Sequence, residues 1–272
     1  MARPSPYRRG HFAPVREEVT AFDLPVTGAI PEDLDGRYLR NGPNPLGIEH
    51  PRFHYYLGAG MIHGVRLAGG RAEWYRNRWV RQAPVLRALR EPRRSYGVLG
   101  GMDAASNINV IGHAGKILSL AEGGTLPFEL SGELDTIGPC DFGGGLRGAM
   151  SAHPKIDPMT GDLHSIGYFA GSPMVDYTVV SAAGRLIRSE RIDLPHAPMM
   201  HDFALTPRYL VLMDLPVTFD VLAAVAGDPF PFRWDPGAVA RLGLLRRVGA
   251  HEQPRWFEIE PVWIYHTVNA HD

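Results

Sequence analysis

The amino-acid sequence predicts an all-β protein, and two observations carry that prediction. Gly (31 residues) and Pro (24 residues) are abundant and scattered along the 272-residue chain, which is typical of many turns rather than of one linker. Between these turns lie short strand-like runs, while runs with a helical pattern are scarce. Short strands at regular spacing indicate a β-sandwich, a barrel or a propeller, and composition alone does not choose among them.

The strands follow in chain order from their turn signals. Residues 61–80 read as two strands around Gly69-Gly70, which is a two-residue hairpin signal. The further strand pairs are predicted in residues 151–169, in residues 177–194 with a turn at Ala183-Gly184, and in residues 201–216 with a turn at Pro207-Arg208; residues 256–270 read as a strand again. Helical patterns are limited to Pro84–Leu89, Val221–Ala226 and residues 238–245.

Charge and cysteine content exclude several classes of protein. The 28 basic and 29 acidic residues leave a net charge of −1, so we expect no nucleic-acid partner. The single cysteine, Cys140, excludes an intrachain disulfide and fits a reducing compartment, with a buried apolar role for its thiol. The N-terminus has no apolar signal region, and the longest apolar run, Val221–Ala226, is far short of the roughly 20 residues of a membrane-spanning helix. We therefore expect a cytoplasmic protein.

Residues 81–101 are a candidate segment for peripheral contact with a membrane. They mix Val85, Leu86 and Leu89 with several arginines, a composition that suits a helix lying on the inner face of an anionic membrane. The alternative is a surface loop that its arginines keep soluble, and both interpretations stay open.

Three segments begin with a histidine and continue into a strand pattern: "HPKID" at His153, "HDFAL" at His201 and "HTVNA" at His266. They lie 48 and 65 residues apart, which fits one four-stranded propeller blade plus insertions in each interval. Histidines at the same place on several inner strands would converge on the propeller axis and hold a metal there. The spacing is not a local metal signature, however, and His63 in "MIHGV" also lies in a strand, so His63 competes with the three.

A metal-bound histidine usually donates its second N–H to a carboxylate. Glu122, at the end of the apolar strand "KILSLAE", is the best candidate for that role. Asp202 directly follows His201, so in a strand it would point to the opposite face, and it is a weaker candidate.

Several longer motifs resemble the carotenoid cleavage oxygenases from Phe12 to the last residue: "DGRYLRNGPNP", "GMIHGVRL", "YRNRWVR", "NVIGHAGKILSLAEGG", "SAHPKIDPMTGDLH", "MMHDFALTPRYLVLMDLPV" and "HTVNA". The resemblance implies a seven-bladed β-propeller with Fe2+ on its axis, held by four histidines from different blades. It implies that His153, His201 and His266 are three of these ligands and that Glu122 supports one of them. It also excludes His63, whose motif carries no ligand in this family.

The resemblance further implies an enzyme: a non-heme Fe2+ dioxygenase that cleaves a conjugated C=C bond of a carotenoid or apocarotenoid with O2 to give carbonyl products. No catalytic side chain is implied beyond the metal centre. Stilbene-cleaving members of the family tend to carry a lysine just before the supporting glutamate, and Ala121 at that position favours the polyene substrates. A zinc hydrolase would need a general base near the metal, and no acid in the sequence has the context for it.

Two departures from the family pattern are visible. The usual "GDGM" is "GAGM" here, with Ala59 in place of the aspartate, for which we expect a local effect only. The family's fourth histidine has no counterpart, so we expect residues 1–272 to be one C-terminally truncated, partial propeller domain with about half of the ring, roughly three blades and the start of a fourth. Residues 1–15 are expected to be a poorly ordered arm. Such a chain is expected to hold iron poorly by itself, and an inactive fragment lacking the fourth ligand stays an alternative.

Overall fold

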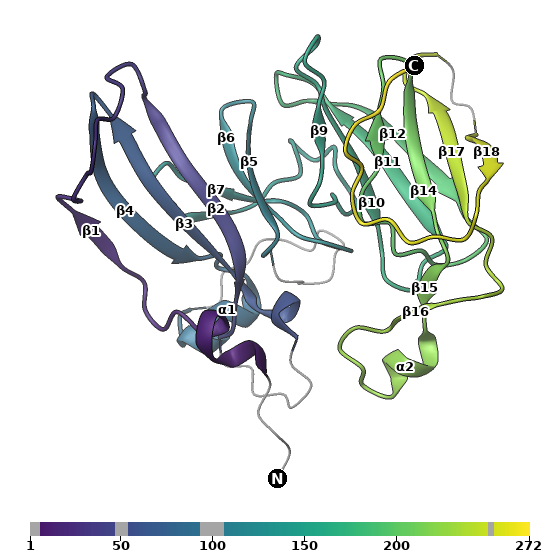
Figure 1. Ribbon diagram of the computed structural model, residues 1–272, viewed down its shortest axis with the longest axis horizontal. Coiled ribbons are helices and arrows are strands. Elements are labelled where there is room, and N and C mark those ends of the chain that lie inside the picture. The colour runs from purple at the N-terminus through teal and green to yellow at the C-terminus, as the bar shows by residue number, and fades with distance from the viewer. Residues whose placement is uncertain (1–5, 47–53, 93–105, 250–252) are drawn as a thin grey trace. The chain divides into compact units, whose positions relative to one another are not determined.

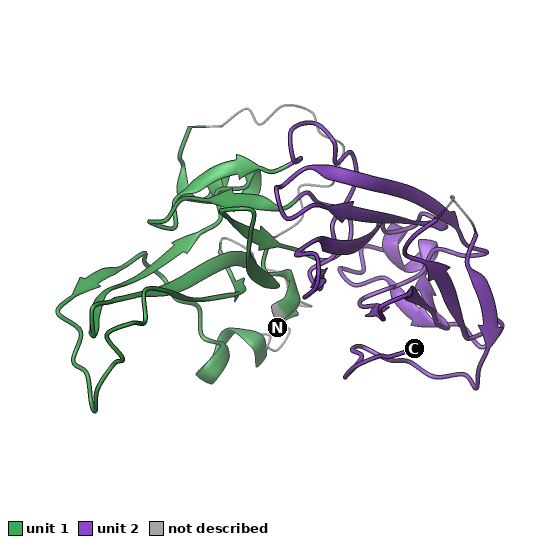
Figure 2. Cartoon of the chain, turned by 90° about the horizontal axis from the view of Figure 1, so that it is seen from above, with its two compact units in different colours: residues 1–98, 103–121, 127–140 green, residues 99–102, 122–126, 141–272 purple. Residues whose placement is uncertain are grey.

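The computed structural model describes residues 6–46, 54–92, 106–249 and 253–272, and strands dominate it (Figure 1). The described residues form four four-stranded antiparallel sheets and one two-stranded sheet. The chain divides into two compact units, which are coloured separately in Figure 2. The all-β prediction is confirmed.

The first unit comprises residues 1–98, 103–121 and 127–140 and holds two of the sheets. One sheet has the order β1-β4-β3-β2 and the other the order β5-β6-β7-β8. Their strands are β1 (Thr20–Phe22), β2 (Gly36–Asn44), β3 (Ala59–Ala68), β4 (Arg71–Trp79), β5 (Asn109–His113), β6 (Lys116–Leu120), β7 (Phe128–Leu130) and β8 (Thr136–Pro139). The predicted hairpin turn lies between β3 and β4, where Gly69 and Gly70 have φ angles of +52° and +73°, as this tight turn requires.

A buried apolar cluster joins the two sheets of the first unit. Strands β3 and β4 contribute Ile62 and Trp74, and β7 contributes Phe128 and Leu130. Burial of these side chains, rather than strand propensity, is what stabilises the pair of sheets.

The second unit comprises residues 99–102, 122–126 and 141–272. Its sheets have the orders β12-β11-β10-β9 and β13-β14-β17-β18, with the two-stranded sheet β15-β16 between β14 and β17 in the chain. Their strands are β9 (Lys155–Ile156), β10 (Leu163–Tyr168), β11 (Met174–Val180), β12 (Leu186–Asp193), β13 (Ala204–Leu205), β14 (Tyr209–Asp214), β15 (Val217–Phe219), β16 (Phe232–Trp234), β17 (Arg241–Arg246) and β18 (Arg255–Glu258). The turns predicted at Ala183-Gly184 and Pro207-Arg208 join β11 to β12 and β13 to β14, so these two predictions are confirmed.

The core of the second unit is larger and runs through both of its four-stranded sheets. Tyr168 and Tyr177 from β10 and β11 and Leu212 from β14 are at most 2% exposed and belong to one cluster, which also includes Phe203 just before β13. Since Phe203 and Tyr168 lie beside the segments that carry the candidate histidines, this core fixes where those segments run.

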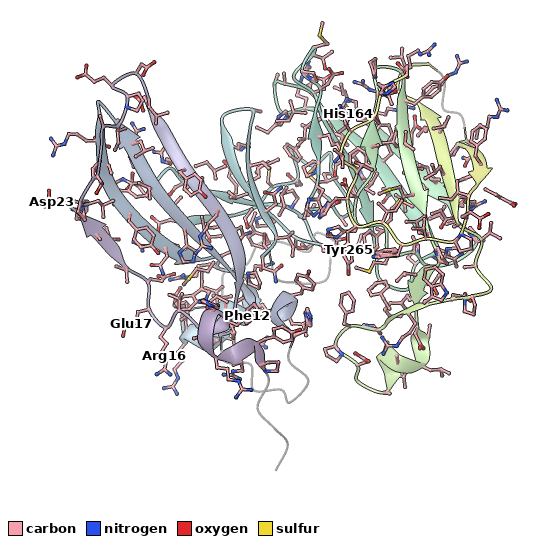
Figure 3. The ribbon with its side chains drawn as sticks, viewed as in Figure 1. Phe12, Arg16, Glu17, Asp23, His164 and Tyr265 are labelled. Atoms are coloured by element: carbon pink, nitrogen blue, oxygen red, sulfur yellow. The ribbon has the colours of Figure 1, made fainter. Side chains whose placement is uncertain are left out.

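A buried polar network also ties the two sheets of the second unit together. His164, labelled in Figure 3, lies inside β10 and is 4% exposed. Arg247 Nη2 donates to His164 Nε2 at 3.2 Å and also forms an ion pair with Asp157. His164 Nδ1 therefore carries the proton and donates to the Tyr177 hydroxyl at 2.7 Å. The pKa of His164 is lowered to about 4, by burial and then by the charge of Arg247.

Two sequence predictions about elements of the second unit are wrong. Residues 241–246 form β17, not a helix, because this segment pairs with β14 on one side and β18 on the other, and sheet pairing overrides the helix propensity of its Leu and Arg residues. The predicted strand in residues 256–270 ends at Glu258. The described chain offers residues 259–270 no neighbouring strand, and a strand needs a hydrogen-bonded neighbour.

The helices of the described residues are few and short. The α-helices are α1 (Ala83–Leu89) and α2 (Val221–Val225), close to the predicted positions, and the 3-10 turns are η1 (Pro6–Arg8), η2 (Gly10–Phe12) and η3 (Tyr55–Leu57). None of the described helices is long and apolar enough to cross a bilayer. Within the predicted N-terminal arm, residues 1–5 lie outside the described residues, and Val15 is anchored by two hydrogen bonds to the Asn44 side chain.

The segment predicted for membrane contact is only partly described. Val85 and Leu86 of α1 are 3% and 2% exposed, so two of the three apolar residues on which that prediction depended are packed inside the first unit. Arg81 forms ion pairs with Glu18 and Glu91 rather than standing free. Residues 93–101 lie outside the described residues.

Candidate metal centre

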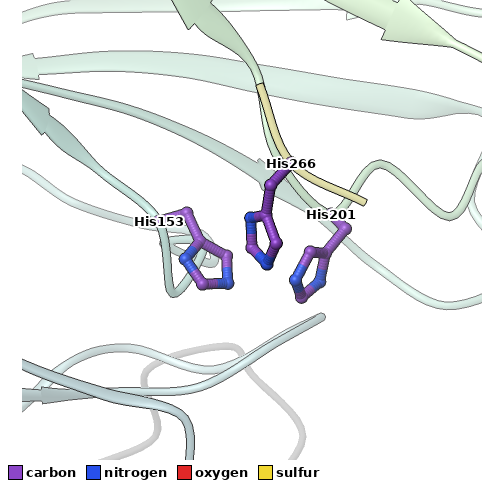
Figure 4. Close-up of side chains that lie close together, drawn as sticks. All are labelled: His153, His201 and His266. Atoms are coloured by element: carbon purple, nitrogen blue, oxygen red, sulfur yellow. The ribbon is translucent and has the colours of Figure 1, made fainter. Parts of the chain in front are cut away.

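The second unit brings the three predicted histidines together (Figure 4). His153 lies two residues before β9, and His201 lies three residues before β13. His266 lies in the irregular segment that follows β18. Three segments far apart in the sequence thus present their imidazoles to one point.

Close packing against β10 determines the position of the segment that carries His153. The Ser151 N–H donates to the carbonyl oxygen of Ile166 in β10 at 2.7 Å. At Gly167 a Cβ atom would lie 2.0 Å from the carbonyl oxygen of Ala149, so only glycine permits this approach of the segment 149–153 to β10.

The imidazoles are close enough to share a metal ion. One nitrogen from each ring lies within 4.8 Å of those from the other two. The ring centroids are 4.5 Å (His153–His201), 4.6 Å (His153–His266) and 4.8 Å (His201–His266) apart. Two nitrogens that each bind a metal at about 2.1 Å are at most about 4.2 Å apart, so inward shifts of a few tenths of an ångström would suffice.

His153 has the properties of a ligand. Its Nε2 is buried and has no hydrogen-bond partner among the described residues. The pKa of His153 is lowered to about 4, by burial and then by the positive charge that His201 and His266 carry when protonated. At neutral pH the ring is therefore uncharged, as a metal ligand must be, and an orphaned buried nitrogen that faces two further imidazoles fits a metal ion.

His201 is oriented by Glu122, the carboxylate predicted for this role. Glu122 Oε2 lies 3.1 Å from His201 Nδ1, which leaves Nε2 of the ring free to face the other histidines. The two atoms are close enough for an ion pair, although their alignment falls short of a well-formed hydrogen bond. Burial alone would lower the pKa of His201, but the contact with Glu122 and its charge outweigh burial and raise it.

Glu122 is itself held in place. Its Oε1 accepts a 2.6 Å hydrogen bond from the hydroxyl of Tyr168 in β10. Burial, and then the charge of Glu122, raise the pKa of Tyr168, so the hydroxyl keeps its proton and donates. No local pattern predicts the role of this tyrosine, because the pairing spans 46 residues.

His266 is supported by Asp202, the weaker of the two carboxylate candidates that the sequence offers. Asp202 Oδ2 lies 3.3 Å from His266 Nδ1. Asp202 was predicted to point away because strand side chains alternate, but residues 201–203 are not in a strand, so the alternation does not apply. Lys155 was also missed; its Nζ donates to Asp202 Oδ1 at 2.7 Å.

His63 belongs to a different environment. It lies in β3 of the first unit, and its Nδ1 is 2.8 Å from the hydroxyl of Tyr75. Among the described residues, the histidines that gather within ligand distance of one another are His153, His201 and His266, and His63 is not one of them.

Comparisons with known proteins place the chain in a family. A family model described as retinal pigment epithelial membrane protein matches residues 12–272. A carotenoid cleavage oxygenase of Mycobacterium tuberculosis is 44% identical over 309 aligned residues, which cover 98% of this chain and 62% of that protein.

Solved structures give the same result. A lignostilbene dioxygenase of Pseudomonas brassicacearum superposes with a TM-score of 0.80 at 32% identity, over 94% of this chain and 56% of that one. A cobalt-substituted ACO of Synechocystis superposes with a TM-score of 0.77 at 26% identity, over 93% and 58%. The chain thus spans less than two thirds of each of these relatives. With this match over nearly its whole length, the chain belongs to the carotenoid cleavage oxygenase family, whose fold is the β-propeller.

Proposed function

We propose that His153, His201 and His266 hold Fe2+ and that the chain forms part of a dioxygenase that cleaves a conjugated C=C bond of a carotenoid or apocarotenoid. The observation that carries the proposal is the convergence of three imidazoles, one of which has a buried nitrogen without a partner among the described residues. Imidazole donors suit iron as well as zinc, copper and nickel, and membership of the family favours iron.

The residues of the chain have distinct tasks in this proposal. His153 supplies a nitrogen that is unprotonated at neutral pH. Glu122 orients His201, and Asp202 orients His266. When bound, Fe2+ would supply the activation of O2 that the protein side chains lack.

The net reaction needs no base or nucleophile from the protein. One O2 adds across one C=C bond, that bond breaks, and each fragment leaves with one oxygen atom as a carbonyl group, so atoms balance without proton transfer. The proposal therefore assigns no catalytic side chain beyond the metal ligands. The protein's part is to position an apolar polyene and O2.

A second candidate function is stilbene cleavage, favoured by the similarity to the Pseudomonas brassicacearum lignostilbene dioxygenase. Ala121 speaks against it, because its methyl group is 1% exposed and offers no amine to a substrate phenol. A third candidate is an inactive fragment or binding module whose metal site lacks the fourth iron ligand.

One experiment separates these candidates. The chain is loaded with Fe2+ and incubated under 18O2 with an apocarotenal and, in parallel, with a 4-hydroxystilbene, and the products are identified by mass spectrometry. Aldehydes from the polyene with one 18O atom in each new carbonyl group, and none from a His201→Gln variant, support the proposal. Products from the stilbene alone would replace it by the second candidate, and metal binding without any product by the third.

The proposed location is the cytoplasm, with contact to the inner face of the membrane through residues 81–101 as the open point. Burial of Val85 and Leu86 reduces the support for that contact. Flotation of the protein with anionic and neutral liposomes tests it: flotation only with the anionic liposomes is expected for docking through arginines, and none is expected otherwise.

A further inference from the structure

We propose that Asp202 is a positioning residue that ties together the three segments carrying the histidines. This inference rests on the proposed metal centre, and it goes beyond it by assigning a role to a side chain outside the ligand set. Asp202 is 1% exposed, so its carboxylate depends on protein partners for all of its hydrogen bonds.

Each oxygen of the carboxylate serves a different segment. Oδ1 accepts from Lys155 Nζ at 2.7 Å and from the Phe203 N–H at 2.7 Å. Oδ2 accepts from the Thr267 N–H at 3.3 Å and lies 3.3 Å from His266 Nδ1. Lys155 is two residues after His153, Asp202 one residue after His201, and Thr267 one residue after His266, so one buried carboxylate links the chain beside all three candidate ligands.

Neighbouring contacts strengthen this arrangement. The Lys155 ammonium group lies 5.1 Å from the centre of the Phe203 ring, within the range of a cation–π interaction. The Thr267 hydroxyl donates to the carbonyl oxygen of Phe203 at 3.4 Å. These contacts matter most for His266, since its segment has no strand pairing and its side chain is 54% exposed.

Asparagine at position 202 is a sharp test because Lys155, the Phe203 N–H and the Thr267 N–H can only donate. A carboxylate offers acceptors on both sides, whereas an amide offers one oxygen and one NH2 group. Either the Lys155 side or the Thr267 side must therefore lose its acceptor. The two 2.7 Å contacts on Oδ1 are expected to keep the oxygen, so the Asp202→Asn variant should release the segment around His266.

Two measurements are made on the 272-residue chain. The first is hydrogen–deuterium exchange of residues 264–270 in the metal-free protein, where Asp202→Asn is expected to speed exchange about tenfold, since a lost positioning contact exposes these amides to local opening. The second is the affinity for Co2+, which is expected to fall about 10- to 100-fold, as for other outer carboxylates of metal sites.

Asp214→Asn is the matched control. Asp214 is 0% exposed and lies in the same unit, and its ion pairs among the described residues join it to Arg241 at 2.7 Å and to His196 at 3.0 Å rather than to residues 153–155, 201–203 or 266–267. It should change both measurements by less than about twofold. Equal effects of the two variants, or no effect of Asp202→Asn, would overturn the proposal.

The proposal can still be tested if a variant does not fold or if the chain binds no metal. If Asp202→Asn does not fold, Lys155→Gln decides: a lower Co2+ affinity supports the proposal, and an unchanged affinity overturns it. If the wild-type chain binds no Co2+, the proposed metal centre fails, while the exchange of residues 264–270 in the metal-free protein still decides the role of Asp202.

Discussion

Replacing Glu122 by glutamine tests whether the carboxylate beside His201 supports the metal centre. Oε1 of Glu122 accepts from the Tyr168 hydroxyl at 2.6 Å, and Oε2 lies 3.1 Å from His201 Nδ1. Glutamine has one acceptor oxygen and one NH2 group. The Tyr168 hydroxyl can turn to accept from the NH2 group, but the His201 N–H can only donate, so the amide oxygen is expected to face His201.

The size of the effect follows from this geometry. A contact with a neutral amide replaces a contact with a charged carboxylate, and interactions of this kind are roughly twice as strong when one partner is charged. Loss of an outer carboxylate typically weakens metal binding 10- to 100-fold, and because Glu122→Gln keeps a contact we expect about tenfold, or about 1.4 kcal/mol. Glu122→Ala removes the contact and should approach about 100-fold. The pKa of His201 in the metal-free protein should fall in both variants, since Glu122 is what raises it.

Two assays check these expectations. Titration with Co2+, followed by its visible absorption and by calorimetry, gives the affinity, and NMR of the imidazole protons gives the pKa of His201. Glu129→Gln is the matched control, since Glu129 pairs with Lys116 at 2.6 Å and is 23% exposed, against 20% for Glu122. Should Glu122→Gln bind Co2+ within about twofold of the wild type, or Glu129→Gln weaken it equally, the reasoning is refuted.

Three further predictions concern other parts of the chain. Burial and Arg247 lower the pKa of His164 to about 4, so between that value and the ordinary histidine pKa of 6.5 the unfolded state binds more protons than the folded state. Stability is therefore complete above this window and falls as pH falls through it. After allowing for screening, His164 should account for about 2 kcal/mol of this loss, and urea titrations at several pH values should show a flatter profile for His164→Gln. Leu212→Ala, at a side chain that is 0% exposed, should lower the free energy of unfolding by about 2–5 kcal/mol, whereas Leu222→Ala, at 81% exposed, should change it by less than about 0.5 kcal/mol; similar losses in urea titrations would contradict the assigned core. His63→Gln should leave Co2+ affinity unchanged, because its partner is Tyr75 in the first unit, and a marked loss in calorimetry would return His63 to the candidate ligands.

Most strands could be predicted from the sequence because the signals are local. The turn at Gly69-Gly70 needs only two residues with positive φ between two strand patterns, and both are visible in the sequence. Residues 241–246 misled the prediction because their pattern suits a helix, and only the presence of β14 and β18 on either side makes them a strand. The strand prediction around His266 is wrong for the opposite reason. The sequence pattern there suits a strand, but the described chain gives the segment no neighbouring strand to pair with.

The residues of the candidate site also fall into two groups: those that local motifs predict and those that depend on contacts between distant parts of the chain. Motifs led to His153, His201, His266 and Glu122, and the structure brings all four together. Asp202 was ranked low by a rule that holds only in strands, and it lies outside one. Tyr168 could not be predicted, because the contact of its hydroxyl with Glu122 joins residues that lie 46 positions apart in the chain.

The most direct test of the account is the binding of one metal ion by the three histidines. Purified chain is titrated with Co2+ under anaerobic conditions, alongside His153→Gln, His201→Gln and His266→Gln. For a site without the family's fourth histidine, we expect weak binding that saturates at one equivalent in the wild type, with an affinity that falls further in each of the three variants and not in His63→Gln. Absence of binding, or binding that survives the loss of His153, His201 or His266, would contradict the assignment of these residues as the metal centre.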